Sequence, residues 1–333
     1  MSPRRIAVVG ATGLVGTALL ECLAARAFPV AELWPLASSG SLGRLASFGG
    51  RERAVLELER FDFERCEIAF FCTPGAVARA HLPRAQAAHC QVIDLSEASR
   101  SDETVPLLIP ALDDTTARAS PLRIASPCAA TLQLAHLLHP LSAACGIERV
   151  SVTVLAPASA AGREAVETLA RESIAALSGR GADDENVTPV AFRCSPVDEH
   201  AAEEPLRGAL IARELQRVLV QPQLSVRVSV VRVPVFYGQA MEVALRLGKP
   251  VGAAAARDVL RSAPGVAVLE LPGAGGYPTA AHEAANRDTV CVGRIREDLA
   301  PDAGLNLWVA ADNVRTGAAN AVEIAEALVQ RPI

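Results

Sequence analysis

The opening of the chain constrains its fold most. A short apolar run at residues 5–9 leads into Gly10-Ala11-Thr12-Gly13-Leu14-Val15-Gly16, and an apolar-rich segment continues over 17–23. This order predicts a strand, a glycine turn and a helix. Glycines let the backbone approach a pyrophosphate, and the N-terminus of the helix offers unpaired N–H groups to the anion. We interpret all seven residues from Gly10 to Gly16 as a dinucleotide-binding loop; a tight turn that binds nothing is the alternative.

The turn after the second strand indicates which dinucleotide binds. That strand is predicted near residues 33–37, and an NAD site is expected to carry an acidic residue there for the ribose. The sequence instead continues through Ser38 and Ser39 to Arg44 without a carboxylate. Hydroxyl groups and a guanidinium suit a 2′-phosphate, so NADP is favoured over NAD. A solvated serine loop is the alternative.

Strands and helices then continue to alternate. A buried strand at 67–72 ends at Thr73, which we include among the candidate cofactor-binding residues; a helix at 76–88 and strands at 91–94 and 122–125 follow. Alternation of this kind predicts an α/β fold with a Rossmann-like, doubly wound parallel sheet. We assign it to residues 1–128.

The second half of the chain has a different pattern. Residues 150–154 and 224–230 alternate apolar and polar side chains, a helix is predicted near 162–177, and 179–198 is loop-like. Later strands are predicted at 266–271, 289–296 and 305–311. We therefore assign residues 129–312 to a mixed or antiparallel α+β domain with a largely open sheet that binds substrate. Its half-exposed strands leave an apolar face to be covered, which predicts a homodimer. The last helix, in 313–333, is expected to pack back on the nucleotide domain.

Composition excludes several classes of function. The formal net charge of −5 argues against nucleic acid as a partner, because phosphate binding needs concentrated positive charge. The sequence has no run of about 18 apolar residues, so no membrane span is expected. The eight cysteines form no CxxC pair, which indicates a reducing, cytoplasmic compartment and no metal site.

Over nearly its whole length the chain resembles the aspartate-semialdehyde dehydrogenase family. The resemblance rests on the glycine loop and on several later segments. They are Val92-Ile93-Asp94 followed by Arg100, Val105 to Pro110, Arg232 to Gly238, Tyr277-Pro278-Thr279, Val292 to Arg296, and the C-terminal run from Trp308 to Glu326. The run Asp312-Asn313-Val314-Arg315-Thr316-Gly317 is the most specific of them.

The resemblance implies an activity and roles for residues. Family members reduce an acyl phosphate with NADPH to a semialdehyde in amino-acid biosynthesis of the aspartate family. A cysteine thiolate forms a thioester, and a histidine handles the proton. The resemblance assigns Arg100 to the phosphate, Arg232 to the substrate carboxylate and Asn313 to the cofactor. For each arginine, an ordinary surface or salt-bridged role is the alternative.

The catalytic segment departs from the family pattern. Family members have Ile-Ala-Asn-Pro-Asn-Cys-Ser-Thr-Ile-Gln where residues 124–133 are Ile-Ala-Ser-Pro-Cys-Ala-Ala-Thr-Leu-Gln. Cys128 therefore aligns with an asparagine, and Ala129 aligns with the nucleophile. A one-residue offset turns a helical side chain by about 100°, and misplacement by ~1 Å can slow attack ~10²-fold. Cys128 remains the candidate nucleophile if it lies in a looser N-cap loop; an inert buried thiol is the alternative.

The proton-carrying histidine is also replaced. Gln239 aligns with it, and an amide cannot carry a proton at neutral pH. A Glu…Lys pair that contacts the substrate in the family aligns with Gly208 and Leu210. This pattern is similar to a divergent, paralogous branch of the family that lacks the usual catalytic residues.

Two hypotheses follow for the function. The first is an NADP-dependent semialdehyde or acyl-phosphate oxidoreductase whose usual activity is impaired, acting on a small-molecule substrate. The second is a non-catalytic, dimeric, NADP-binding paralogue with a regulatory or partner-binding role. An assay with aspartate semialdehyde, phosphate and NADP discriminates between them.

Overall fold

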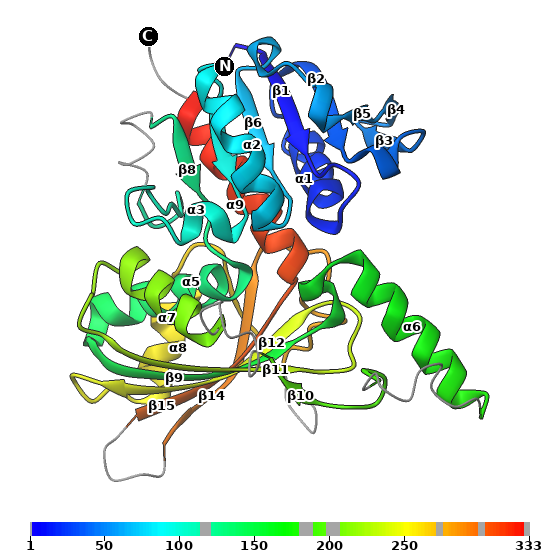
Figure 1. The fold of residues 1–333 in the computed structure, drawn as a ribbon. Helices are drawn as coiled ribbons and strands as arrows, with labels where there is room; N and C mark the ends of the chain where they lie inside the picture. Colours follow the sequence, from blue (N-terminus) through cyan, green and yellow to red (C-terminus); the bar gives the residue numbers. More distant parts are fainter. Residues whose placement is uncertain are drawn as a thin grey trace. The chain divides into compact units, whose positions relative to one another are not determined.

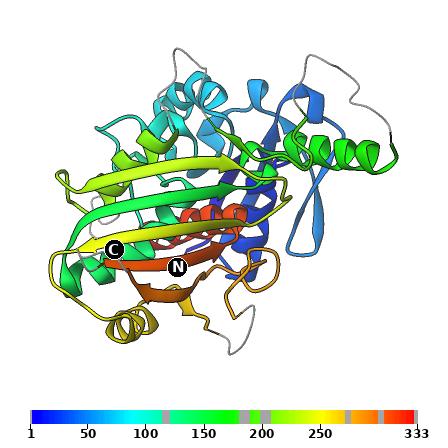
Figure 2. The same cartoon turned by 90° about the horizontal axis from the view of Figure 1, so that it is seen from below.

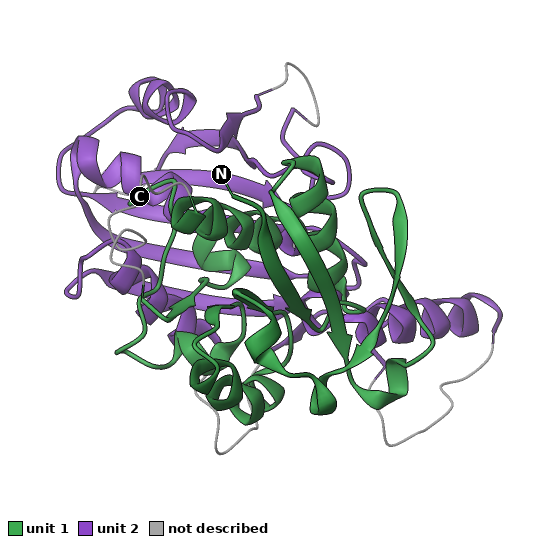
Figure 3. Cartoon of the chain, turned by 90° about the horizontal axis from the view of Figure 1, so that it is seen from above, with its two compact units in different colours: residues 1–132, 315–333 green, residues 133–314 purple. Residues whose placement is uncertain are grey.

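The computed structural model describes residues 2–113, 121–179, 189–197, 207–270, 276–298 and 304–329. The chain divides into two compact units, drawn in different colours in Figure 3. Unit 1 comprises Met1–Leu132 and Arg315–Ile333, and unit 2 comprises Gln133–Val314. The C-terminal segment thus belongs to the same unit as the N-terminal sheet.

Unit 1 is built on a parallel sheet with strand order β5-β2-β1-β6-β7-β8 (Figure 1). The strands are β1 (Arg4–Val9), β2 (Val30–Ala37), β5 (Leu56–Glu57), β6 (Ile68–Phe71), β7 (Gln91–Asp94) and β8 (Arg123–Ala125). Dinucleotide-binding folds have this strand order. In them the ligand binds at the carboxyl ends of the strands, at the point in the middle of the sheet where the strand order reverses. The predicted Rossmann-like sheet is confirmed.

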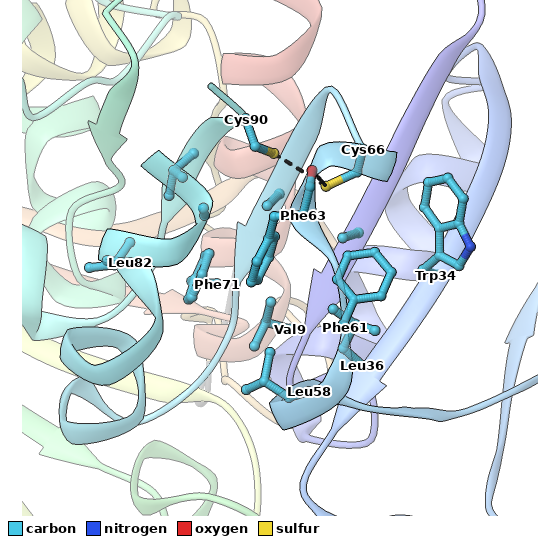
Figure 4. Close-up of a cluster of buried hydrophobic side chains, with 14 of the residues drawn as sticks. Val9, Trp34, Leu36, Leu58, Phe61, Phe63, Cys66, Phe71, Leu82 and Cys90 are labelled. Atoms are coloured by element: carbon cyan, nitrogen blue, oxygen red, sulfur yellow. Dashed lines mark hydrogen bonds between the residues drawn. The ribbon is translucent and has the colours of Figure 1, made fainter. Parts of the chain in front are cut away.

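Helices surround this sheet. They are α1 (Leu14–Ala25), α2 (Gly75–Ala87), α3 (Glu97–Arg100), the start of α5 (Ala129–Cys145) and most of α9 (Asn313–Val329). Short 3₁₀ turns, η1 (Ser39–Ser41), η2 (Leu58–Arg60) and η3 (Phe63–Arg65), complete the connections, and β3 (Leu45–Phe48) pairs with β4 (Arg51–Ala54) as a hairpin. Aromatic side chains from η3 and β6 pack in a buried cluster together with Val9 and Leu36 (Figure 4). Burial of such side chains on one face of a sheet is the main source of its stability.

Unit 2 contains a mixed sheet with strand order β10-β11-β9-β12-β15-β14-β13. The strands are β9 (Ile147–Ala156), β10 (Ser195–Pro196), β11 (Ser225–Arg232), β12 (Gln239–Leu247), β13 (Val266–Val268), β14 (Val290–Glu297) and β15 (Gly304–Ala311). The β9–β11 and β13–β14 pairs are parallel and the others are antiparallel. The unit also contains η4 (Ala158–Ala161), α6 (Arg163–Leu177), α7 (Arg207–Val218) and α8 (Ala253–Arg261). The predicted mixed sheet is confirmed.

The sheet of unit 2 has one covered and one open face. Helices α5, α7 and α8 lie over one face in Figure 1, and Figure 2 views the other face with no helix in front of the strands. On β9, Val150, Val152 and Val154 are buried, whereas Ser151 and Thr153 point the other way and are more exposed. Helices of the same chain therefore cover the face that carries Val150, Val152 and Val154, and the other face of the sheet is open. The open face carries Ser151, Thr153 and Leu155 of β9, Ala240, Glu242 and Ala244 of β12, and Trp308 of β15, so it combines small, polar and large apolar side chains.

Several elements differ from the sequence-based predictions. Strand β12, the β3–β4 hairpin and the short β10 were not predicted. The strand predicted at 266–271 ends at Val268, because the carboxylate of Glu270 accepts a hydrogen bond from the Ile295 N–H (3.1 Å) where a backbone partner would be needed. Leu271 lies outside the described residues. Among the described helices, none combines the length and apolar character needed to cross a bilayer.

Candidate cofactor and substrate sites

The predicted dinucleotide loop follows β1 and requires glycine at two positions. Gly10 has φ +83°, and a Cβ there would lie 2.5 Å from the carbonyl oxygen of Cys72. A Cβ on Gly16 would collide with the carbonyl oxygen of Gly10. The Gly10 and Ala11 N–H groups both donate to Leu36 O (2.8 and 3.1 Å), which fixes the start of the turn against β2. A side chain at either glycine would force the turn open.

The N-terminus of α1 is open to an anion. Its N-cap is Gly13, which has no capping side chain, and no acidic residue lies in the first turn, which begins with Leu14 and Val15. Helix α2 differs, because its Gly75 N–H already donates to the Glu97 carboxylate (3.0 Å). The four unpaired N–H groups at a helix start favour a phosphate oxygen. The local structure therefore fits a pyrophosphate.

Thr73 supplies a second feature that suits a ligand at this loop. A Cβ on Gly10 would lie 2.9 Å from its methyl carbon, so Thr73 stands beside the loop. Its hydroxyl oxygen is buried and has no hydrogen-bond partner among the described residues. A buried unpaired hydroxyl is unfavourable unless a ligand or water satisfies it. Burial raises the pKa of the adjacent Cys72 thiol, and the negative charge of Asp94 adds a smaller contribution. Cys72 therefore stays protonated.

The serine turn after β2 also lies at this loop. Ser38 precedes η1, and the hydroxyls of Thr12 and Ser41 are 3.4 Å apart. Ser38, Ser39 and Arg44 are exposed, and the Arg44 guanidinium forms no hydrogen bond or ion pair with any described side chain. Ser41 was not among the predicted site residues, although it belongs to the same serine-rich turn. Exposed hydroxyls and an unpaired guanidinium are suitable donors for a phosphate.

Arg100 ends α3, whose start is fixed by a buried carboxylate. Asp94 accepts hydrogen bonds from the Ser96 N–H (2.8 Å), the Ser96 hydroxyl (3.0 Å) and the Ser99 N–H (3.2 Å). The Arg100 guanidinium donates through Nη1 to Leu95 O (2.7 Å). One donor of Arg100 is therefore used to hold its own turn.

Cys128 lies immediately before α5, in the N-cap position. Its carbonyl oxygen accepts the Leu132 N–H (2.9 Å), and its Sγ is 3.2 Å from the Thr131 hydroxyl. The preceding segment is held by Asn320, which donates to the Ser126 hydroxyl (2.8 Å). Ala129 is the first helical residue. The structure thus places the cysteine in the N-cap and puts alanine on the first turn.

Gln239 begins β12 and is 4% exposed. Its Nε2 donates to Oε1 of Gln133 (2.9 Å), a fully buried residue of α5. Nε2 of Gln133 has no hydrogen-bond partner among the described residues. We call these two side chains the Gln133–Gln239 pair. Two neutral amides can orient a ligand, but they provide no group that titrates near neutral pH.

Asn313 lies beside this pair at the start of α9. Its Oδ1 accepts the Gly238 N–H (3.2 Å) and the Ser159 hydroxyl (3.1 Å). Both hydrogen bonds are accepted by the amide oxygen. The NH₂ group of Asn313 takes no part in them and can donate to another acceptor. Sequence reasoning missed Gln133 and Ser159, which lie 106 and 154 residues from their partners.

Arg232 ends β11 and lines a cavity of about 300 Å³ within unit 2. The cavity wall is mostly apolar, with the polar side chains of Glu164, Thr168 and Arg232. The Arg232 side chain has no hydrogen-bond or ion-pair partner among the described residues. A guanidinium in this position can bind a carboxylate through two parallel hydrogen bonds.

Gly208, where the family's substrate contact is expected, cannot carry a side chain. A Cβ there would collide with the carbonyl oxygen of Val228 on β11. Leu210 is half-buried on the same helix and is apolar. The helix α7 therefore supplies neither the acid nor the base at these two positions. No cluster of three metal-ligating side chains occurs in the part of the chain that the structure describes.

Comparison with known proteins decides the family. A model of the semialdehyde dehydrogenase NAD binding domain matches residues 5–119, and a model of the semialdehyde dehydrogenase dimerisation domain matches 138–316. An aspartate-semialdehyde dehydrogenase of Legionella pneumophila is 39% identical over 330 residues, covering 97% of this chain and 95% of that protein. The chain belongs to the aspartate-semialdehyde dehydrogenase family.

Two further proteins are similar to this chain along their whole length. The crystal structure of aspartate semialdehyde dehydrogenase II from Vibrio cholerae, complexed with ASA, has a TM-score of 0.93 and 35% identity, with 100% of both chains covered. A USG-1 protein homolog of Pseudomonas aeruginosa is 36% identical, with 98% of both chains covered. The aspartate-semialdehyde dehydrogenase fold is thus retained over the whole chain.

Proposed function

We propose that the chain is an NADP-binding member of the family in which phosphate-dependent oxidation of aspartate semialdehyde is impaired. The Gln133–Gln239 pair carries this proposal. Where the family resemblance requires a histidine that carries a proton, the chain has a buried amide that is bonded to a second amide. General acid–base catalysis contributes about 10²–10⁴-fold to a rate, and an amide supplies none of it.

The nucleophile position supports the same proposal. Ala129 occupies the register of the family's cysteine and begins α5, whereas the Cys128 thiol contacts the Thr131 hydroxyl from the N-cap. We assign Cys128 to any residual covalent step. If Cys128 takes no part in catalysis, the chain is the non-catalytic paralogue. The Gln133–Gln239 pair supports this alternative as well.

The cofactor site is proposed to be intact. Gly10 to Gly16 would hold the pyrophosphate, and the hydroxyl of Thr73 would bond the cofactor beside the loop. Asn313, oriented by Ser159, would present its NH₂ group to a carbonyl acceptor. When bound, NADP supplies the hydride chemistry. We further assign Arg232 to the substrate carboxylate and Arg100 to the phosphate.

A steady-state assay tests the proposed impairment. With aspartate semialdehyde, phosphate and NADP, NADPH formation is expected at least about 100-fold below the usual enzyme range of roughly 1–10³ s⁻¹, because both reacting groups are displaced or absent. The Legionella pneumophila relative, assayed in parallel, controls for the substrate. Turnover in the ordinary range that Cys128→Ser abolishes would show that Cys128 is a competent nucleophile and would refute the proposal.

We also propose that the chain forms a homodimer through the open face of the unit 2 sheet. Two observations support this: the match to a dimerisation domain, and the fact that none of the described helices lies over that face in Figure 2. Light scattering is expected to give about twice the 34.8 kDa of one chain. Ala244→Arg, which adds a long charged side chain to the open face, should give monomers, whereas Glu64→Arg on an exposed turn of unit 1 should not. A monomeric wild-type protein at micromolar concentration contradicts the proposal.

A further inference from the structure

Two buried thiols of unit 1 lie in contact. The Sγ atoms of Cys66 and Cys90 are 3.3 Å apart (Figure 4). Cys66 follows η3 and precedes β6, and Cys90 follows α2 and precedes β7. Because β6 and β7 are neighbouring parallel strands, the two cysteines meet at the amino ends of the strands. The glycine loop lies at the opposite, carboxyl edge of the same sheet.

The backbone holds both cysteines in place. The Cys66 N–H donates to Phe63 O (3.1 Å), and the Cys90 N–H donates to Ala85 O (3.0 Å) at the end of α2. His89, just before Cys90, adopts a left-handed conformation with φ +54°, which turns the chain back toward β6. The thiols are thus brought together by backbone structure, although they are 24 residues apart in sequence.

The two thiols are buried to slightly different extents. Cys90 is fully buried and Cys66 is 4% exposed, and both pack against the aromatic cluster that includes Phe63 and Phe71. The hydrogen bond with Cys66, together with burial, raises the pKa of the Cys90 thiol. Because Cys66 is the more exposed of the two, we expect a small oxidant to reach it first. A disulfide needs an S–S separation of about 2.05 Å, so rotation about the side-chain bonds has to remove just over 1 Å.

We propose that Cys66 and Cys90 form a reversible disulfide when the protein meets a peroxide. Hydrogen peroxide oxidises the Cys66 thiol to a sulfenic acid and leaves as one water. The Cys90 sulfur then attacks the Cys66 sulfur, its proton joins the departing hydroxyl as a second water, and the S–S bond forms. Two thiols are oxidised by two electrons and one peroxide is reduced. A thiol reductant reverses the step.

The disulfide would change stability rather than cofactor binding. It would close a loop between η3 and the end of α2, and such a cross-link restricts the unfolded chain. We expect the oxidised protein to melt about 5 °C higher than the reduced protein. Its affinity for NADP should change by less than about twofold, because the cross-link lies at the edge of the sheet opposite the glycine loop. This inference does not depend on the proposed catalytic impairment.

Mass spectrometry on the full-length wild-type protein tests the proposal. After hydrogen peroxide treatment and blocking of free thiols, trypsin cleavage after Arg65, Arg79, Arg84 and Arg100 gives peptides 66–79 and 85–100. These peptides are expected to appear joined, two hydrogens lighter than their sum, and to separate on reduction. Peptide 66–79 also contains Cys72, so fragmentation must locate the bond at Cys66. Cys66→Ser should remove the cross-link, and Cys194→Ser should keep it.

The exposed Cys194 reports whether the oxidant has acted. If Cys194 is oxidised while Cys66 and Cys90 remain free thiols, the proposal is wrong. It is equally wrong if Cys66 proceeds to a sulfinic acid without a cross-link, or if the bond forms at Cys72. The wild-type protein decides each case, so a variant that folds poorly does not obscure the result.

Discussion

Ala129→Cys alone and Gln239→His alone are each expected to leave the phosphate-dependent oxidation of aspartate semialdehyde within about tenfold of the wild-type rate. Residues that act as one catalytic unit are strongly non-additive, so restoring one member recovers little of the lost rate. The histidine should be tolerated, because the orphaned Nε2 of Gln133 could donate to the imidazole. Steady-state NADPH formation, with circular dichroism to confirm folding, measures the effect.

The double variant Ala129→Cys/Gln239→His separates two causes of impairment. Recovery by more than about 100-fold would mean that the nucleophile and the base were the main losses. A double variant that stays near background would point to substrate contacts, because Gly208 has no room for a side chain beside Val228. If either single change restored an ordinary turnover rate, the impairment would not be due to the joint loss of the nucleophilic cysteine and the histidine. Cys128→Ser in the double variant is the matched control and should retain its rate.

NADP is expected to bind about 10–100-fold more tightly than NAD. A charge-assisted hydrogen bond to phosphate contributes about 1.5–3 kcal/mol, and the end of β2 carries no carboxylate to bind an NAD ribose or repel the phosphate. Arg44→Glu should remove most of this preference, because it places a negative charge where Arg44 now offers donors. Calorimetric titration with both nucleotides measures the two affinities.

The hairpin beside this site provides a matched control. Arg53 on β4 is exposed and pairs with Ala46 on β3, so Arg53→Glu makes the same charge change on the neighbouring strand. It should leave the NADP preference within about twofold, and Arg44→Glu should leave NAD affinity nearly unchanged. Equal affinity of the wild-type protein for NADP and NAD would show that the turn after β2 does not recognise the 2′-phosphate.

Much of the fold could be predicted because local patterns dominate it. The strand Gln91–Asp94 and the helix starting at Asn313 were placed from apolar runs and periodicity, and the glycine turn required one local conformation. Strand β12 was not predicted, although buried and more exposed side chains alternate along it; small residues such as Ala240 and Ala244 on the more exposed face weaken the contrast in its sequence. The β4 strand Arg51–Ala54 is entirely exposed, so burial leaves no pattern in its sequence.

The candidate site was less predictable, because its partners are distant in sequence. Gln239 was identified by alignment with a family position, but its bond to Gln133 depends on how α5 packs over β12. The contact of Thr12 with Ser41 likewise depends on two separate βα turns. Side-chain pairs of this kind follow from tertiary packing, which neither periodicity nor spacing encodes. The clash between a Cβ at position 208 and the carbonyl oxygen of Val228 likewise depends on how α7 packs against β11.

A single-turnover experiment without phosphate tests the central claim most directly. An active family member, whose cysteine is correctly positioned, should form one NADPH per active site as its thioester accumulates. Phosphate is not needed for this step, because it only releases the acyl group from the cysteine. Mixing the wild-type protein with NADP and aspartate semialdehyde is predicted to give no such burst and no mass adduct. One equivalent of NADPH together with an acyl adduct on Cys128 would contradict the claim that the chain binds the cofactor but has lost the usual chemistry.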